Sequence, residues 1–293
     1  MKISVVGPGA IGILFAIRLT ESAQTVTLVD HDTDRAERLA KSGLSLITEN
    51  DITITTKPAT ATAIPAKQDL IIVCTKSYAT QSLELPSNIP VLTIQNGLGN
   101  VETLCKIVGS SNVIAGSTSE AATLLEEGQI RHAASGITTL GAWAGCSTES
   151  AEHALKNVGF DIQTTMFPGQ MLWEKAVINA GINPLTALLN VPNGHLLHQK
   201  EIRQLMRDLV VEAARVASTE GYRFEYSLVE KAEEVCKKTA SNISSMLQDV
   251  RDNRQTEIEA ISGEILRRCD AASLTAPRTR VIYQLIKGME LSS

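Results

Sequence analysis

A glycine-rich turn near the start of the chain constrains the fold more than any other feature. It runs Gly7-Pro8-Gly9-Ala10-Ile11-Gly12 and directly follows the apolar segment 2–6. GxGxxG between a strand and a helix is the signature of a dinucleotide-binding unit. The first glycine permits the tight turn, the second lets the backbone approach a pyrophosphate, and the third allows close helix–strand packing. Phosphate would then bind the free N–H groups at the helix N-terminus. The alternative is a purely structural turn.

Strand and helix patterns alternate through the first half of the chain. Strands are predicted at 2–6, 25–29, 70–74, 91–94, 113–115 and 161–165. Helical patterns lie between them at 10–20, 36–42, 102–108 and 149–158. Residues 44–57 suggest a strand pair, and 129–132 with 137–141 suggest an antiparallel pair closing the sheet. This alternation predicts a doubly wound, mainly parallel sheet.

Strand patterns end after Pro168, and only helical patterns follow. They cover 171–189, 200–220, 228–238, 245–251, 257–271 and 277–289. We therefore predict an α/β protein with a Rossmann-like domain in residues 1–166 and an all-α substrate and catalytic domain in residues 167–293.

Composition excludes several classes of protein. The chain has 293 residues, is 43% hydrophobic and carries a net charge of −5, so it can fill two cores, and a nucleic-acid partner is not expected. It has five widely spaced cysteines, which favour reduced thiols and a cytoplasmic location. No zinc motif is present, so no metal is expected. No apolar segment reaches the roughly 18 residues that span a membrane.

Polar residues follow two predicted strands at the edge where such sheets bind ligands. Lys76 lies two residues past Cys74, and Asn96 and Gly97 follow the strand ending at Ile94. A lysine there can meet a phosphate or a ribose, and Asn96 can contact both cofactor and substrate. Each signal alone also fits an ordinary turn.

The end of the second strand bears on cofactor preference. Asp30 there would accept from ribose hydroxyls and favour NAD, whereas His31 and Arg35 could meet the 2′-phosphate of NADP. A solvated turn also fits this segment, so the choice between NADPH and NADH stays open.

A polar stripe is expected on the first helix of the second half. Lys175, Asn179 and Asn183 are spaced by four, which places an ammonium and two carboxamides on one helical face. A surface lysine is the alternative, but the apolar neighbours favour a half-buried face. With the dinucleotide loop, this stripe favours a reductase in which Lys175 donates a proton, its pKa lowered in a closed site.

Two helix starts further on fit capping boxes. Ser245 with Gln248, and Thr256 with Glu259, have the Ser/Thr-x-x-Glu/Gln spacing. Ser245 and the nearby free N–H groups would then hold a substrate carboxylate. The second box would place Glu257 in a first helical turn. Plain capping is the alternative for both.

Together these segments resemble the 2-dehydropantoate 2-reductase (ketopantoate reductase) family of pantothenate biosynthesis. The resemblance runs nearly end to end, and its later pieces are far more specific than the glycine loop. The matching pieces are GPGAIG at 7–12, Thr75-Lys76, QNG at 95–97, WEKAVINAGINPLTAL at 173–188, VPNG at 191–194, NISSMLQD at 242–249 and RQTEIEAISG at 254–263.

The resemblance implies a two-domain enzyme with its active site in the cleft, reducing 2-dehydropantoate to (R)-pantoate with NADPH. It implies that Lys175 is catalytic and also binds substrate. The other implied substrate contacts are Asn179, Asn183, Asn193, Asn242 and Ser245. The implied cofactor contacts are the loop Gly7, Pro8, Gly9, Ala10, Ile11 and Gly12, then His31, Lys76, Asn96, Ala122 and Glu257. The resemblance leaves open whether Glu257 contacts the cofactor, the substrate or both.

One departure from the family bears on the cofactor. His31 stands where members commonly carry an arginine that grips the 2′-phosphate. NADPH is therefore expected, with NADH not excluded. Two other functions stay open: a related 2-oxo acid or hydroxy acid dehydrogenase, and a dinucleotide-binding regulator without turnover. A homodimer is expected.

Overall fold

The chain divides into two compact units, each with its own core. A computed structural model describes residues 1–22 and 24–290. The first unit comprises Met1–Gln95 and Asn100–Pro168, and the second comprises Asn96–Gly99 with the chain from Gly169 onward. The four residues 96–99 thus leave the first unit and return to it.

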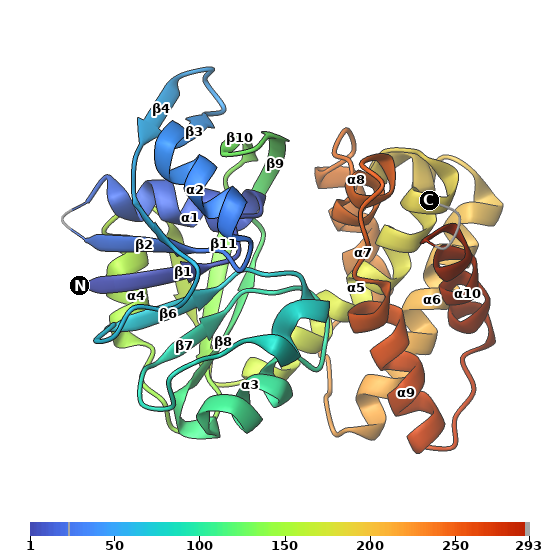
Figure 1. Cartoon of the computed structure of the whole chain (residues 1–293). Coiled ribbons are helices and arrows are strands. Elements are labelled where there is room, and N and C mark those ends of the chain that lie inside the picture. The colour runs from blue at the N-terminus through green and yellow to red at the C-terminus, as the bar shows by residue number, and fades with distance from the viewer. Residues whose placement is uncertain (23, 291–293) are drawn as a thin grey trace. The chain divides into compact units, whose positions relative to one another are not determined.

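An eight-stranded sheet forms the centre of the first unit (Figure 1). Its strand order is β12-β11-β8-β7-β6-β1-β2-β5. Neighbours from β5 to β8 pair in parallel, β11 pairs antiparallel with β8, and β12 is parallel to β11. The strands are β1 (Lys2–Val6), β2 (Thr25–Val29), β5 (Ala59–Ala61), β6 (Leu70–Val73), β7 (Val91–Thr93), β8 (Val113–Thr118), β11 (Ile137–Ala142) and β12 (Asp161–Thr164). The predicted doubly wound sheet is confirmed.

A second sheet of four strands has the order β4-β3-β10-β9. These strands are β3 (Leu44–Ile47), β4 (Thr53–Thr56), β9 (Ala121–Glu126) and β10 (Gln129–Ala134). The predicted pairing of 129–132 with 137–141 is wrong, because β10 pairs antiparallel with β9 and parallel with β3, while β11 pairs with β8. The sequence of β9 is Ala-Ala-Thr-Leu-Leu-Glu, which is poor in strand-forming residues, and only its partner makes it a strand.

Helices pack on the first unit's sheets. They are α1 (Ala10–Thr20), α2 (Thr33–Ser42), α3 (Asn100–Val108) and α4 (Glu149–Lys156), with short 3-10 turns η1 (Ser77–Ser82) and η2 (Ser110–Asn112). Seven residues of α1 are buried, namely residues 12–17 and Leu19. Its Phe15 stacks on Phe160, with the ring centroids 4.5 Å apart. Helix α1 therefore lies inside the core rather than on it.

The second unit is helical around the apolar helix α5 (Pro168–Leu189). The other elements are η3 (Asn193–Leu197), α6 (Lys200–Thr219), α7 (Leu228–Lys238), α8 (Ser245–Arg251), the π-turn η4 (Glu259–Gly263), α9 (Glu264–Ala271) and α10 (Pro277–Glu290). The predicted all-α character is confirmed. The five cysteines carry free thiols. None of the helices in the described part of the chain has the length and apolarity of a membrane span.

Candidate functional site

The glycine loop has the geometry that a bound pyrophosphate needs. Gly7 has φ +100°, and a Cβ there would lie 2.8 Å from Thr75. A Cβ on Gly12 would lie 2.0 Å from the carbonyl oxygen of Gly7. At Gly9, which caps α1, no heavy atom lies within 4 Å of the corresponding position. Two glycines are thus required by packing, and the third leaves the open space that a phosphate approach requires.

The loop lies where the order of the sheet reverses. It follows β1, which lies between β2 and β6. The crevice outside the carboxyl ends of such strands is where doubly wound sheets bind ligands. Lys76, predicted to contact the cofactor, follows β6 and is half-buried. The loop and Lys76 therefore belong to one edge of one sheet.

A buried polar network fixes the segments around Lys76. The side-chain amide of Gln95 donates to the Thr75 carbonyl and to the Thr80 hydroxyl, both at 2.9 Å. Thr80 donates in turn to Asn100 Oδ1 at 2.9 Å. These bonds join the loops after β6 and β7, so the backbone beside Lys76 is held in one position.

The end of β2 carries an ion pair that the sequence did not predict. Asp30 is 2% exposed, and its carboxylate accepts from both Nε and Nη2 of Arg35, the latter at 2.7 Å. The side chain of His31 is 91% exposed. The Asp30 carboxylate is therefore neutralised by Arg35, and the guanidinium of Arg35 and the imidazole of His31 both lie at this strand end.

Two further predicted cofactor contacts are held by the second unit. Asn96 Nδ2 donates to Glu257 Oε2 at 3.3 Å, which unites residues far apart in the sequence. Gly97 has φ +82°, and a Cβ there would lie 2.5 Å from the carbonyl oxygen of Ala260. Ala260 belongs to the π-turn η4, and its carbonyl accepts a hydrogen bond from Leu98 N at 2.8 Å. The remaining contact, Ala122, lies half-buried on β9.

Lys175 occupies a half-buried position on α5. Burial lowers its pKa from the usual 10.5 to about 8, although the carboxylate of Glu257 acts to raise it. A perturbed lysine beside a buried carboxylate is typical of a functional site. A lysine with this pKa can be both charged donor and proton source near neutral pH.

The predicted stripe is present on α5. The helix is continuous through Lys175, Asn179 and Asn183, with Pro184 inside it. Asn183 is 7% exposed and Asn179 is half-buried. Neither amide makes a side-chain hydrogen bond within residues 1–22 and 24–290. Two largely buried amides without protein partners favour a ligand as their partner.

Asn193 and Asn242 lie together in the second unit. Asn193 N donates to the Asn242 carbonyl at 3.0 Å. Asn193 Nδ2 donates to the Thr239 hydroxyl at 2.9 Å, and Thr239 donates to Val235, so the amide has one orientation. Its Oδ1 is buried and has no hydrogen-bond partner in the described part of the chain. This oxygen can therefore accept a hydrogen bond from a bound ligand.

Both predicted capping boxes are wrong. The cap of α8 is Ser244, whose buried hydroxyl accepts from Leu247 N at 3.1 Å and from Thr186 at 2.7 Å. Ser245 is the first helical residue and is exposed, so its hydroxyl is not the cap. The sequence places two serines together, and only the burial of one beside Thr186 selects the cap.

At the second predicted helix start, Glu290 takes the place of Glu259 as the partner of Thr256. Thr256 N and its hydroxyl both donate to Glu290 Oε1, at 2.9 and 2.6 Å. Glu259 instead accepts from Tyr283 at 2.7 Å. Glu257 therefore lies before the helix rather than in its first turn, and it is 7% exposed.

No cluster of three or more His, Cys, Asp or Glu suited to a metal occurs in residues 1–22 and 24–290.

Comparison with known proteins gives matches over both units. Residues 3–145 match a family model described as ketopantoate reductase PanE/ApbA, and residues 169–290 match its C-terminal counterpart. A 2-dehydropantoate 2-reductase of Halobacterium salinarum is 35% identical over 297 residues, covering 98% of each chain.

Solved structures are similar over the whole chain. A D-mandelate dehydrogenase in complex with NADH and anilino(oxo)acetate has a TM-score of 0.91 and 26% identity, covering 100% of this chain and 99% of that one. A PanE/ApbA family ketopantoate reductase from Ralstonia eutropha JMP134 has a TM-score of 0.90 and 25% identity, with the same coverage.

Two glycine substitutions should separate packing from ligand binding. Gly12→Ala should lower the free energy of unfolding by about 1–3 kcal/mol, because its Cβ meets the Gly7 carbonyl. Gly9→Ala should change stability by no more than about 0.5 kcal/mol yet weaken dinucleotide binding about tenfold, because its Cβ fills open space. Urea unfolding and fluorescence titration measure these effects. Equal losses of stability would contradict the assignment.

The ammonium of Lys175 should titrate well below other lysines. ¹⁵N NMR of labelled lysine should find a pKa of about 8. Glu257→Gln should lower that pKa further, because the carboxylate raises it. Glu259→Gln is the matched control, since Glu259 is 53% exposed and pairs with Lys287. An unchanged pKa in Glu257→Gln would show that the two groups do not interact.

Proposed function

Because the chain belongs to the ketopantoate reductase PanE/ApbA family, we propose that it reduces 2-dehydropantoate to (R)-pantoate in pantothenate biosynthesis. The observation that carries this proposal is the half-buried Lys175, with its pKa of about 8, on the same helix as two amides without protein partners. A protein that only bound a dinucleotide would have no need of this arrangement.

Lys175 would act on the carbonyl oxygen of the substrate. When bound, the reduced nicotinamide supplies a hydride to C2. The ammonium of Lys175 donates a hydrogen bond to the oxygen on which negative charge develops, and then transfers its proton there. Its lowered pKa favours that transfer, and Glu257 keeps enough of the charged form present at neutral pH.

The amides would select and orient the substrate. Buried Asn193 Oδ1 lacks a donor, and the terminal hydroxyl of 2-dehydropantoate can supply one. Asn179 and Asn183 offer further donors and acceptors along α5, and the exposed hydroxyl of Ser245 offers a donor for the carboxylate. Asn242 would act beside Asn193, whose backbone its carbonyl already holds.

The cofactor would be held mainly by backbone groups. Gly9 and the N-terminus of α1 would receive the pyrophosphate, with Lys76 and Ala122 as further contacts of the first unit. Asn96 and Glu257 would contribute from the second. We assign most of the nucleotide contacts to residues 1–166, and substrate binding with the Glu257 contact to residues 167–293.

NADPH is the proposed cofactor. The Asp30 carboxylate would repel a 2′-phosphate if it were alone, but Arg35 neutralises it, and His31 lies exposed beside it. The guanidinium of Arg35 and the imidazole of His31 would together replace the single arginine common in the family.

A second candidate is reduction of another 2-oxo acid with NADH. Asp30 favours it, since a carboxylate at the end of β2 accepts from ribose hydroxyls. The similar D-mandelate dehydrogenase was solved with NADH. The homodimer and the cytoplasmic location expected from the sequence stay predictions.

The reaction is tested by following nicotinamide absorbance as 2-dehydropantoate is added with NADPH. Lys175→Ala should lower kcat/KM by about a hundredfold to a thousandfold, because the hydrogen-bond donor to the developing negative charge is lost. Lys200→Ala, which removes an exposed lysine at the start of α6, should be unaffected. Cofactor binding without oxidation of any 2-oxo acid would instead support a regulator.

Cofactor choice is tested by the ratio of kcat/KM for NADPH to that for NADH. Arg35→Gln should lower this ratio about tenfold or more, because a charged contact to the phosphate is lost and Asp30 is left unneutralised. Arg38→Gln is the control, since Arg38 pairs with Glu127 at 2.7 Å. A wild-type ratio below one would favour the second candidate.

A further inference from the structure

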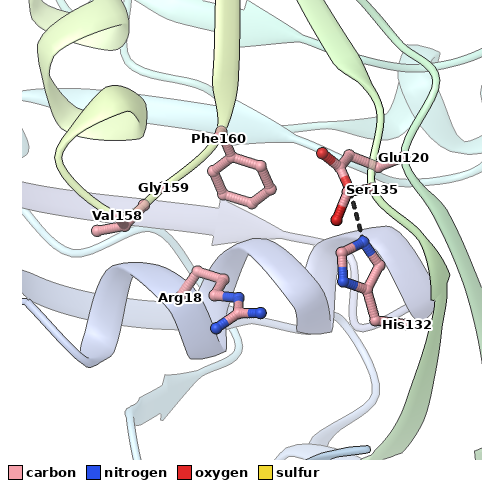
Figure 2. A pocket seen from close by; sticks show the side chains of 7 residues that line it. All are labelled: Arg18, Glu120, His132, Ser135, Val158, Gly159 and Phe160. Atoms are coloured by element: carbon pink, nitrogen blue, oxygen red, sulfur yellow. Dashed lines mark hydrogen bonds and ion pairs between the residues drawn. The ribbon is translucent and has the colours of Figure 1, made fainter. Parts of the chain in front are cut away.

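A cavity of about 180 Å³ lies in the first unit, distinct from the glycine loop (Figure 2). Its lining comes from the last turn of α1, from the segment before β9, from β10, and from the segment before β12. The side chains that carry chemistry are Arg18, Glu120 and His132, and Val158 and Phe160 form an apolar wall. None of these residues has a part in the proposed reduction.

His132 and Glu120 form a buried pair. His132 Nε2 lies 2.5 Å from Glu120 Oε2, and the two side chains are only 6% and 3% exposed. Glu120 is held in place because its N–H donates to the Thr118 hydroxyl at 3.1 Å, which is itself bonded to Thr138 at 2.7 Å. Burying two ionisable groups costs free energy, and apolar residues would often serve stability as well. The pair therefore invites a functional explanation.

The second nitrogen of His132 faces the cavity. The pair uses Nε2, and Nδ1 makes no hydrogen bond within residues 1–22 and 24–290. In Figure 2 this nitrogen points toward the guanidinium of Arg18. An imidazolium donates at both nitrogens, so one N–H can hold Glu120 while the other serves a ligand.

Arg18 supplies a second donor group from the last turn of α1. Its side chain is 27% exposed, and its ion pair with Glu21 is long, at 3.5 Å. Such a pair at the surface is worth about 0–1 kcal/mol and leaves most of the five N–H donors available. Arg18 and His132 thus present two nitrogen donor groups beside a single carboxylate, that of Glu120, and a bound anion would complement this arrangement.

The remaining wall sets the size and polarity of the ligand. Phe160 is 8% exposed and is fixed by stacking on Phe15. A cavity of this size resembles engineered cavities of about 150 Å³ that admit benzene, so a ligand of about six heavy atoms fits.

We propose that this cavity binds a small aliphatic monocarboxylate. The carboxylate accepts from the Arg18 guanidinium and from His132 Nδ1–H, and its alkyl group lies against Phe160 and Val158. Glu120 orients the imidazole from behind through its hydrogen bond with Nε2. The site does not depend on the proposed reductase function.

Isobutyrate, with six heavy atoms and no oxo group, is the probe. The imidazole ¹⁵N signals of the whole protein are followed during titration, and His132→Gln identifies the signal of His132 among the five histidines. We expect a saturable change at His132. Arg18→Gln should weaken this binding about tenfold or more, because a charge-assisted bond is lost.

Two controls separate this site from others. Arg38→Gln removes the same charge from α2 outside the cavity and should leave the titration unchanged. Lys175→Ala should leave it unchanged too, which excludes binding at the proposed catalytic site. Val158→Phe, which fills the cavity from its apolar side, should abolish it. No change at His132, equal binding by Arg18→Gln, or loss in Lys175→Ala would overturn the proposal.

Discussion

The contact between α1 and the turn that precedes it decides the geometry of the first unit. The helix lies so close that a Cβ on Gly12 would reach 2.0 Å from the Gly7 carbonyl. This approach directs the helix N-terminus at the carboxyl end of β1, and it sends the apolar body of α1 through the core. One helix therefore presents backbone N–H groups at its first turn and Arg18 at its last. The dinucleotide loop and the proposed carboxylate site share this rigid element.

The second unit gathers polar groups that burial leaves incompletely satisfied. Lys175 has a lowered pKa, and the Asn193 carboxamide oxygen has no donor in the described residues. Each arrangement costs folding free energy, and a chain selected for stability alone would avoid it. The π-turn η4 adds to this pattern, since it frees the Ala260 carbonyl to hold the segment 96–99, and such turns are frequent at functional sites.

The local capping motifs predicted the wrong hydrogen-bond partners where a residue distant in sequence competed for the same hydrogen bond. Ser245 and Thr256 both begin box-like sequences, yet Ser244 with Thr186 caps one helix and Glu290 satisfies the other start. A capping box contributes about 1 kcal/mol, which is less than the cost of leaving a buried hydroxyl or carboxylate without a partner. Tertiary burial therefore decides which of the two adjacent serines caps α8. In the same way, the buried Asp30 carboxylate accepts hydrogen bonds from Arg35 and is not left to be satisfied by a ligand alone.

The doubly wound sheet, the helical second half, the glycine loop and the stripe from Lys175 to Asn183 could all be predicted from the sequence, because strand alternation, glycine spacing and helical periodicity are local properties of the chain. The pairing of β10 with β9 and β3, the place of residues 96–99 in the helical unit and the contact of His132 with Glu120 arise only in the folded chain. Strand partners and buried ion pairs unite residues with no fixed spacing. Their choice depends on which surfaces the completed fold removes from water.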